Sequence, residues 1–507
     1  MDSNGDGIGD LEGIRQRLDH LVWLGVDAVW ISPCFPSPMA DFGYDVADYC
    51  DVDPVFGKLA DLDRLLADAH ARGIRVLLDL VPNHSSSAHP WFQESRASRT
   101  SAKRDWYVWR DPKPDGAPPN NWLAAFGGPA WSFDETSGQS YLHSFLPEQP
   151  DLNWRNPEVV RAMHGVVRFW FERGVDGFRI DVIHRIAKDP KLRDNPVLDA
   201  AHGFGGQRHV HDENHPDVHR MLRGLRRLAD RYPERAYVGE VYLMDPAEVA
   251  RYCAPDELHL GFNFSFLRAP WSAEAFRHET ERFQKCLGRR GWPNHVLSNH
   301  DAPRHASRYD HPVLGEARAR LAALLLLTLR GTPFLYQGEE IGMRNVPVPE
   351  DRLQDPLAKR LHPTLSRDPS RTPLPWQAGP GAGFTSGAPW LPFGADAGVR
   401  NVAAQQADPA SLLSLYRDAL ALRKRTRALH AGGYAALPAP AGVFAFERRA
   451  GRQRARVALN FGDAPVTVSL GAGRAADGLH TRAGAALPER LGRVTLGPCE
   501  GLVAVLA

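Results

Sequence analysis

The chain of 507 residues carries 61 Lys and Arg against 60 Asp and Glu, which gives a formal net charge of +1 at pH 7. This balance excludes the global field that recruits nucleic acid or an anionic membrane surface. The length exceeds one ordinary core, so we expect one large domain with smaller satellites. Five scattered cysteines argue against a disulfide framework, and the first residues form no secretory signal. We expect a cytoplasmic protein with no nucleic-acid or membrane partner, and the sequence leaves its oligomeric state open.

Short apolar runs that end in polar residues alternate with helical patterns, which is typical of βα units around a parallel sheet. Residues 11–24 predict the first helix, directly after an opening Asp/Gly loop. The longest apolar run, residues 321–329, is too short to cross a bilayer and predicts a buried helix. Strands are expected at residues 27–33, 75–83, 175–181, 236–241, 258–264, 295–301 and 332–338.

A closed barrel of this kind needs eight strands, and the sequence supplies seven. The shortage falls at the beginning, because helical sequence follows the opening loop with no strand ahead of it. We therefore expect an α/β fold, a (β/α)8 TIM barrel whose first strand is missing at the N-terminus of this chain and lies upstream. The alternatives are a barrel that closes in an unusual way and a shortened chain that folds poorly.

Three domains are expected. Residues 1–83 and 154–431 would form the catalytic barrel, domain A. Periodicity fails over residues 84–153, where Pro, Gly, Trp and Ser dominate, and this predicts an inserted irregular domain B. Short β-like segments separated by turn residues predict an all-β domain C over residues 432–507. A Pro-rich stretch, residues 345–400, is expected to fold over the same rim as domain B.

Three acids stand at the ends of predicted strands, where a barrel of this kind places its reactive side chains. They are Asp181, Glu240 and Asp301. A retaining glycosidase needs a nucleophilic carboxylate and a protonated carboxyl roughly 5–5.5 Å apart. The short Asp181 suits the nucleophile and the longer Glu240 suits the acid, while Asp301 would hold sugar hydroxyls and oppose the positive charge of the transition state.

Arg179 lies two residues before Asp181, so both side chains share one face of the strand. A guanidinium in that position is expected to keep Asp181 ionised. Alone, a strand-end Asp is more often a helix cap or a salt-bridge partner. Three acids with Arg179 and His300 beside them favour catalysis.

Four segments in order resemble the conserved regions of the α-amylase superfamily, glycoside hydrolase family 13. They are DLVPNH (79–84), GFRID (177–181), GEVY (239–242) and SNHD (298–301). DSNGDGIGDLEGI (2–14), QPDLNW (149–154) and RTPLPW (371–376) resemble its α-glucosidase and oligo-1,6-glucosidase branch. The resemblance implies a (β/α)8 barrel, an inserted domain B, a β-sandwich domain C and retaining exo-hydrolysis of terminal α-linked glucose from a small oligosaccharide or α-glucoside.

The resemblance also implies substrate-binding residues. Asp41 and Tyr44 would grip and stack on the terminal glucose. The other implied contacts are His84, Phe126, Phe145, Gln149, Arg179, His300 and Arg371. Val182, directly after Asp181, resembles the oligo-1,6-glucosidase type and favours α-1,6 bonds or a broad specificity over α-1,4 bonds alone; its alternative role is packing at the strand end.

The opening loop spaces oxygen-bearing residues as the first nine positions of an EF-hand loop do. The expected calcium ligands are Asp2, Asn4, Asp6, the carbonyl of Ile8 and Asp10. Gly13 stands where an EF-hand needs a bidentate Glu, so we do not expect a helix-flanked EF-hand. The loop instead resembles the structural calcium site of bacterial α-glucosidases, and a solvated acidic turn is the alternative. No organic cofactor is expected.

The function expected from these motifs is a retaining α-glucosidase that acts through a covalent glucosyl-Asp181 intermediate on α-1,6 or α-1,4 bonds. A transglycosylase or isomerase of the same superfamily, of trehalose synthase or sucrose isomerase type, would use the same acids. A non-catalytic homologue is the remaining alternative.

Overall fold

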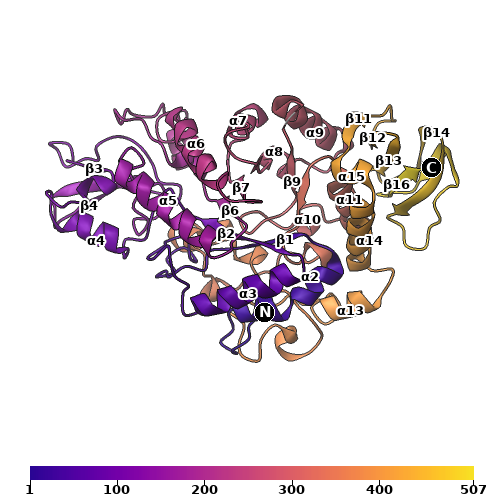
Figure 1. Cartoon of the computed structure of the whole chain (residues 1–507), viewed down its shortest axis with the longest axis horizontal. Coiled ribbons are helices and arrows are strands. Elements are labelled where there is room, and N and C mark those ends of the chain that lie inside the picture. Colours follow the sequence, from indigo (N-terminus) through magenta and orange to yellow (C-terminus); the bar gives the residue numbers. More distant parts are fainter. Residues whose placement is uncertain (290) are drawn as a thin grey trace.

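The computed structural model describes residues 1–289 and 291–507 (Figure 1). Within this part of the chain, a five-stranded parallel sheet has the order β1-β2-β6-β7-β8, and β9 and β10 form a separate parallel pair. All the predicted strands are present, each shorter than expected. Their bounds are β1 (Ala28–Ile31), β2 (Arg75–Leu80), β6 (Gly177–Ile180), β7 (Ala236–Gly239), β8 (Leu260–Gly261), β9 (Asn294–Val296) and β10 (Thr332–Phe334).

The strands β1 and β10 each keep one edge unpaired. Among the described residues, β1 pairs only with β2 and β10 only with β9. The residues of β10 are half-buried and Ala28 in β1 is exposed, whereas all of β6 is buried. The predicted barrel fold is thus present, and among the described residues its strand pairing is interrupted between β8 and β9 as well as at the free edges of β1 and β10. That an eighth strand precedes residue 1 stays a prediction.

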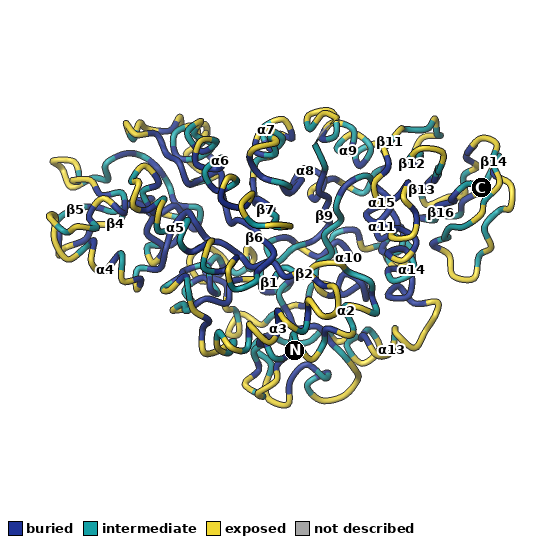
Figure 2. The backbone as a smooth tube through the Cα atoms, viewed as in Figure 1, coloured by how far each residue is buried: buried dark blue, intermediate teal, exposed yellow. Residues whose placement is uncertain are grey.

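Helices surround the strands, and Figure 2 shows the buried backbone concentrated along the strands and the inner turns of the helices. The first predicted helix forms as two, which meet at Arg17, and the apolar run at 321–329 lies in α11 as expected. No helix in the described chain is long and apolar enough to cross a bilayer. The barrel helices are α1 (Leu11–Gln16), α2 (Leu18–Leu24), α3 (Leu59–Ala71), α5 (Pro157–Glu172), α6 (Asp217–Ala229), α7 (Pro246–Tyr252), α8 (Phe264–Leu267), α9 (Ala273–Leu287), α10 (His305–Arg308) and α11 (Gly315–Thr328).

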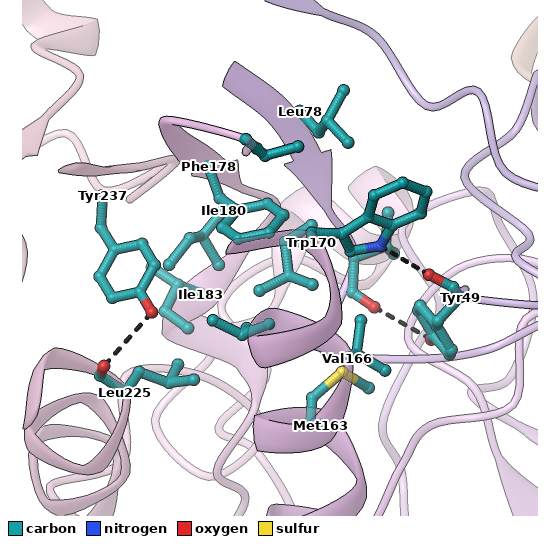
Figure 3. Close-up of a cluster of buried hydrophobic side chains, with 14 of the residues drawn as sticks. Tyr49, Leu78, Met163, Val166, Trp170, Phe178, Ile180, Ile183, Leu225 and Tyr237 are labelled. Atoms are coloured by element: carbon teal, nitrogen blue, oxygen red, sulfur yellow. Dashed lines mark hydrogen bonds between the residues drawn. The ribbon is translucent and has the colours of Figure 1, made fainter. Parts of the chain in front are cut away.

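Helix α5 shows how the sequence sets the position of the central strands. The Asn156 side chain caps its N-terminus by accepting from the amide of Glu158, and Pro157 occupies the first turn. Its apolar face then packs on β6 through Trp170, whose indole N–H donates to the carbonyl of Tyr49 (2.8 Å). Figure 3 shows this cluster. The packing fixes β6, whose last residue precedes Asp181.

The segment expected as domain B leaves the barrel after β2. It contains α4 (Pro90–Ala97) and a three-stranded antiparallel sheet of β3 (Trp109–Arg110), β5 (Gln139–Leu142) and β4 (Trp131–Asp134), which Figure 1 shows at one end of the molecule. Trp122 and Trp131 form its own small core with Ala130 and Leu142. The segment is therefore less irregular than its composition predicts.

After β10 the chain runs through short turns and four helices before a C-terminal β-sandwich. The helices are α12 (Pro356–Arg360), α13 (Val402–Ala407), α14 (Leu412–Arg425) and α15 (Arg427–Ala431). The long strand β14 bends at a register shift, so it pairs first with β15 and then with β16 and encloses an apolar core. The strands are β11 (Gly433–Ala436), β12 (Val443–Ala450), β13 (Gln453–Asn460), β14 (Val466–His480), β15 (Arg490–Leu496) and β16 (Gly501–Leu506).

Candidate active site

The predicted acids lie at the carboxyl ends of their strands. Asp181 directly follows β6 and its amide donates to the carbonyl of Leu80 (2.8 Å). Glu240 directly follows β7 and its amide donates to the carbonyl of Ile180 (2.8 Å). Asp301 lies in the loop after β9. The sheet register therefore places Asp181 and Glu240 side by side, and both side chains are buried.

Arg179 joins three carboxylates. Its Nη1 lies 2.7 Å from Asp181 Oδ1 and 2.9 Å from Asp79 Oδ1, and its Nη2 lies 2.6 Å from Glu240 Oε2. The two amino groups of one guanidinium thus hold Asp181 and Glu240 together. This fits the short separation, about 5 to 5.5 Å, that direct nucleophilic attack on a sugar requires.

The cluster has three carboxyl groups but only one positive charge, that of Arg179. Burial raises the pKa of Asp181 well above its ordinary value, and the nearby charges of Glu240 and Asp79 add to the effect. Arg179 lowers this pKa, but its one positive charge is divided among three acids and burial prevails, so the expectation that the guanidinium keeps Asp181 ionised is not met. Burial also raises the pKa of Asp79 to about 6. Burial and mutual repulsion thus favour protonation of one carboxyl in this cluster, which is what a pair with one acid and one nucleophile needs.

Asp301 lies in a different electrostatic environment. Its Oδ1 is 3.0 Å from Arg367 Nη1 and 2.8 Å from Arg371 Nη2, and His300 lies beside it. Burial opposes ionisation, but the neighbouring positive groups hold the pKa of Asp301 well below its ordinary range. Asp301 is therefore charged near neutral pH.

Tyr44 and His300 form one wall of the site. Their rings stack with centroids 5.7 Å apart, and Tyr44 Oη lies 2.9 Å from His300 Nε2. Tyr44 also donates to Asp79 Oδ2 (3.0 Å), which links this wall to the Arg179 cluster. Burial lowers the pKa of His300 to about 3, so the ring is neutral.

The remaining predicted residues adjoin Tyr44, through the contact of His84 Nε2 with its carbonyl, or Arg367. Asp41 Oδ1 lies 3.1 Å from Arg367 Nη2, and Gln149 Nε2 lies 3.2 Å from His84 Nε2. Phe145 packs against His84 at 5.2 Å and against Phe126 at 5.6 Å. All twelve acids and substrate-binding residues singled out from the sequence are linked by these contacts to one another or to Arg367.

Three residues of the site were not predicted from the sequence: Arg367, Asp355 and Asp79. Arg367 contacts Asp41 and Asp301, and Asp355 holds it with both carboxylate oxygens. The signal was present in RDPSR, because a turn over residues 368–370 brings the two flanking arginines, Arg367 and Arg371, to the same carboxylate. Asp79 is the first residue of the DLVPNH motif, but the sequence alone did not indicate its contact with Arg179.

Val182 adopts a left-handed backbone (φ 31°, ψ 43°), which is rare for a β-branched residue and costs of order 1–3 kcal/mol. Its amide donates to Glu240 Oε2 (3.2 Å), so the turn that follows the nucleophile also positions the acid. Its side chain is buried, as the packing interpretation expects.

Hydrogen bonds between side chains and nearby backbone amides hold the opening loop, residues 2–10, in its turn conformation. The side chains of Asp2, Asn4 and Asp6 each accept a hydrogen bond from the backbone amide two residues further along the chain. The last of these amides is that of Ile8. Asp2 also accepts from Gly5 and Gly7 amides, and Asp10 caps α1. Among the described residues, no three His, Cys, Asp or Glu side chains surround a common point that a metal could take. The calcium site therefore stays a prediction.

Comparisons with known proteins agree with this geometry. The family description "Alpha amylase, catalytic domain" matches residues 1–432. A probable alpha-glucosidase of Rhizobium meliloti (strain 1021) is 45% identical over 93% of this chain and 88% of its own length. An oligo-1,6-glucosidase of Parageobacillus thermoglucosidasius is 38% identical over 91% of this chain and 88% of its own.

Solved structures extend the similarity to other chemistry. The alpha-glucosyl transfer enzyme XgtA is 43% identical with a TM-score of 0.93, covering all of this chain and 97% of its own. The trehalulose synthase MutB of Pseudomonas mesoacidophila MX-45 is 34% identical with a TM-score of 0.91, covering all of this chain and 96% of its own. The match over most of the chain and the acids at the barrel rim lead to one conclusion: the chain belongs to the α-amylase superfamily, glycoside hydrolase family 13, and is a glycoside hydrolase.

Proposed function

We propose that the enzyme is a retaining, exo-acting α-glucosidase that removes terminal α-linked glucose from short oligosaccharides. The observation that carries the proposal is the shared guanidinium of Arg179, which holds Asp181 and Glu240 on its two amino groups. Two carboxyls held on one guanidinium lie close together, which favours direct attack over an inverting mechanism, where the carboxyls stand about 6.5–9.5 Å apart.

In the first step Asp181 attacks the anomeric carbon while Glu240 gives its proton to the glycosidic oxygen, so the aglycone leaves as an alcohol. In the second step the ionised Glu240 takes a proton from water, the resulting hydroxide displaces Asp181 from the sugar, and the configuration is retained. The permanently charged Asp301 stabilises the positive charge that develops on the ring in both steps.

The exo mode rests on how the far side of the site is closed. Asp41 is buried, and Arg367 joins it to Asp301 while Asp355 anchors the guanidinium from behind. A polysaccharide that continued past the terminal glucose would have to displace this bridge. Separating a half-buried arginine from the acids it bridges costs free energy, which supports a site for one terminal sugar.

A second candidate is glucosyl transfer or isomerisation at the same acids, favoured by the similarity to XgtA and MutB. The two differ in whether water or a sugar displaces Asp181. Incubation with maltose, isomaltose, sucrose and trehalose, with products resolved by chromatography, separates them. We expect free glucose, with isomaltose cleaved well because of Val182. Rearranged disaccharides as the main product would assign the enzyme to transfer instead.

We also propose that the opening loop binds calcium with a structural role. The Asn4 amide oxygen and both Asp6 carboxylate oxygens accept one hydrogen bond each, so each keeps a second lone pair that suits a hard cation. The two oxygens of Asp2 already accept two bonds each, so Asp2 would have to exchange some of them for the metal. Millimolar calcium is expected to raise the melting temperature by several degrees, because a ligand that binds only the folded state stabilises it. The double variant Asp2→Asn/Asp6→Asn should lose this increase. An equal increase in the variant would remove the loop from metal binding.

A further inference from the structure

A buried polar network that the mechanism does not use lies beneath His84. Lys188 comes from the loop after β6, Asp151 from the end of domain B and Asn83 from the loop after β2, and all three are buried. Lys188 Nζ lies 2.7 Å from Asp151 Oδ2 and donates to Asn83 Oδ1 (2.7 Å). Asn83 Nδ2 donates to Asp151 Oδ1 (3.0 Å) and lies 3.1 Å from His84 Nδ1.

The donors and acceptors of this network leave one arrangement for the Asn83 amide. A lysine ammonium can only donate, so it must face the amide oxygen, and a carboxylate can only accept, so it must face the amide nitrogen. The Asn83 N–H groups are thereby directed at Asp151 and His84 together. His84 Nδ1 must then accept, and the ring proton must lie on Nε2.

The other side of the ring agrees. His84 Nε2 lies 3.0 Å from the carbonyl oxygen of Tyr44, which can only accept, so Nε2 carries the proton there as well. Burial lowers the pKa of His84 to about 4, so the ring has a single proton near neutral pH. Gln149 has its amide oxygen bonded to the amide of Leu146 (3.0 Å), so its Nε2 donor faces the Nε2–H donor of His84 at 3.2 Å. This pair forms no hydrogen bond in the Nε2–H tautomer, which the Asn83 amide and the Tyr44 carbonyl favour.

We propose that Lys188 is a positioning residue that fixes His84 as the Nε2–H tautomer through the amide of Asn83, and that this N–H group, held by the Tyr44 carbonyl, is shared with a sugar hydroxyl when the glucose site is occupied. If Lys188 loses its charge and donors, the Asn83 amide oxygen loses its partner and Asp151 alone holds the amide, which can then turn more readily. Its oxygen then faces His84 Nδ1, which favours the Nδ1–H form and leaves a bare nitrogen at Nε2. The contact with a sugar rests on the proposed function, whereas the tautomer of His84 depends only on the residues of this chain.

The test reads the tautomer directly. The protein is labelled with ¹⁵N-histidine, and the His84 signals are identified among the 21 histidines by their loss in His84→Gln. The wild type is expected to show a bare Nδ1 and a protonated Nε2. Lys188→Met should show a substantial Nδ1–H population, and its KM for p-nitrophenyl α-glucoside should rise about tenfold, as expected for one lost hydrogen bond, with a smaller change in kcat. Lys424→Met, which removes an exposed lysine paired with Asp27, is the matched control and should change neither.

Asn83→Ala provides a second variant that keeps the Lys188–Asp151 ion pair, and it decides the question if Lys188→Met does not fold. It removes the amide that bonds Nδ1, so it should also mix the two tautomers. A folded Lys188→Met or Asn83→Ala protein in which His84 remains wholly Nε2–H, with an unchanged KM, would overturn the proposal. Because the spectrum needs no substrate, a wild type that fails to hydrolyse α-glucosides would defeat the proposed function and leave the tautomer result standing.

Discussion

Asp181→Asn is expected to lower kcat for p-nitrophenyl α-glucoside by about 10⁴-fold or more, because an amide cannot form the covalent bond on which later steps depend. The KM should change much less, since Arg179, His84 and Asp301 remain in place. Steady-state rates with a purified, folded variant provide the measurement.

The matched control for this substitution lies on the same strand. Asp176 stands just before β6, at the opposite end of the barrel, where its buried carboxylate bonds Arg75 and His70. Asp176→Asn should lower thermal stability and leave kcat near its original value. Comparable losses of kcat in both variants would mean that Asp181 matters for folding and not for attack on the sugar.

Glu240→Gln is expected to affect substrates according to their leaving groups. Hydrolysis of isomaltose and maltose, whose alcohols need a proton in order to leave, should slow by about 10²–10⁴-fold. Hydrolysis of p-nitrophenyl α-glucoside should slow far less in its first step, because a nitrophenolate leaves without protonation. The ratio of kcat/KM between the two substrates therefore reports the acid role.

Glu257→Gln serves as the comparison for that variant. Glu257 is equally buried, but it lies before β8 and bonds His219 and Arg223 of α6, away from the acids at the rim. It should leave the substrate ratio unchanged. An equal loss on both substrates in Glu240→Gln would assign the proton donor to another group.

The sequence predicted the strand-end acids because a parallel barrel brings the ends of all its strands to one rim. Asp181 and Glu240 needed only the identification of β6 and β7, which apolar runs mark clearly. The partners that set their charge were harder to predict. Asp79 shares Arg179 with both acids, and that contact depends on the register between β2 and β6, which no local pattern records.

Arg367 was missed for another physical reason. It lies in a Pro-rich stretch without helical or strand periodicity, so the direction of its side chain cannot be derived from spacing. Asp355 draws it into the site from twelve residues away. Lys188 was missed because a lysine three residues beyond the strand-end turn has the pattern of a solvent-exposed residue, and only the folded chain shows that Asp151 and Asn83 surround it.

The unpaired edges of β1 and β10 have a consequence for how this enzyme loses activity on warming. A strand bonded to one neighbour opens at a lower free energy than one bonded on both sides, so amides in β1 should exchange with deuterium before those in β2 and β6. Trp30 in β1 donates its indole N–H to Asp79 Oδ2 (3.2 Å). Transient release of β1 therefore loosens the carboxylate that shares Arg179 with the nucleophile, and inactivation by heat should precede the loss of helical structure.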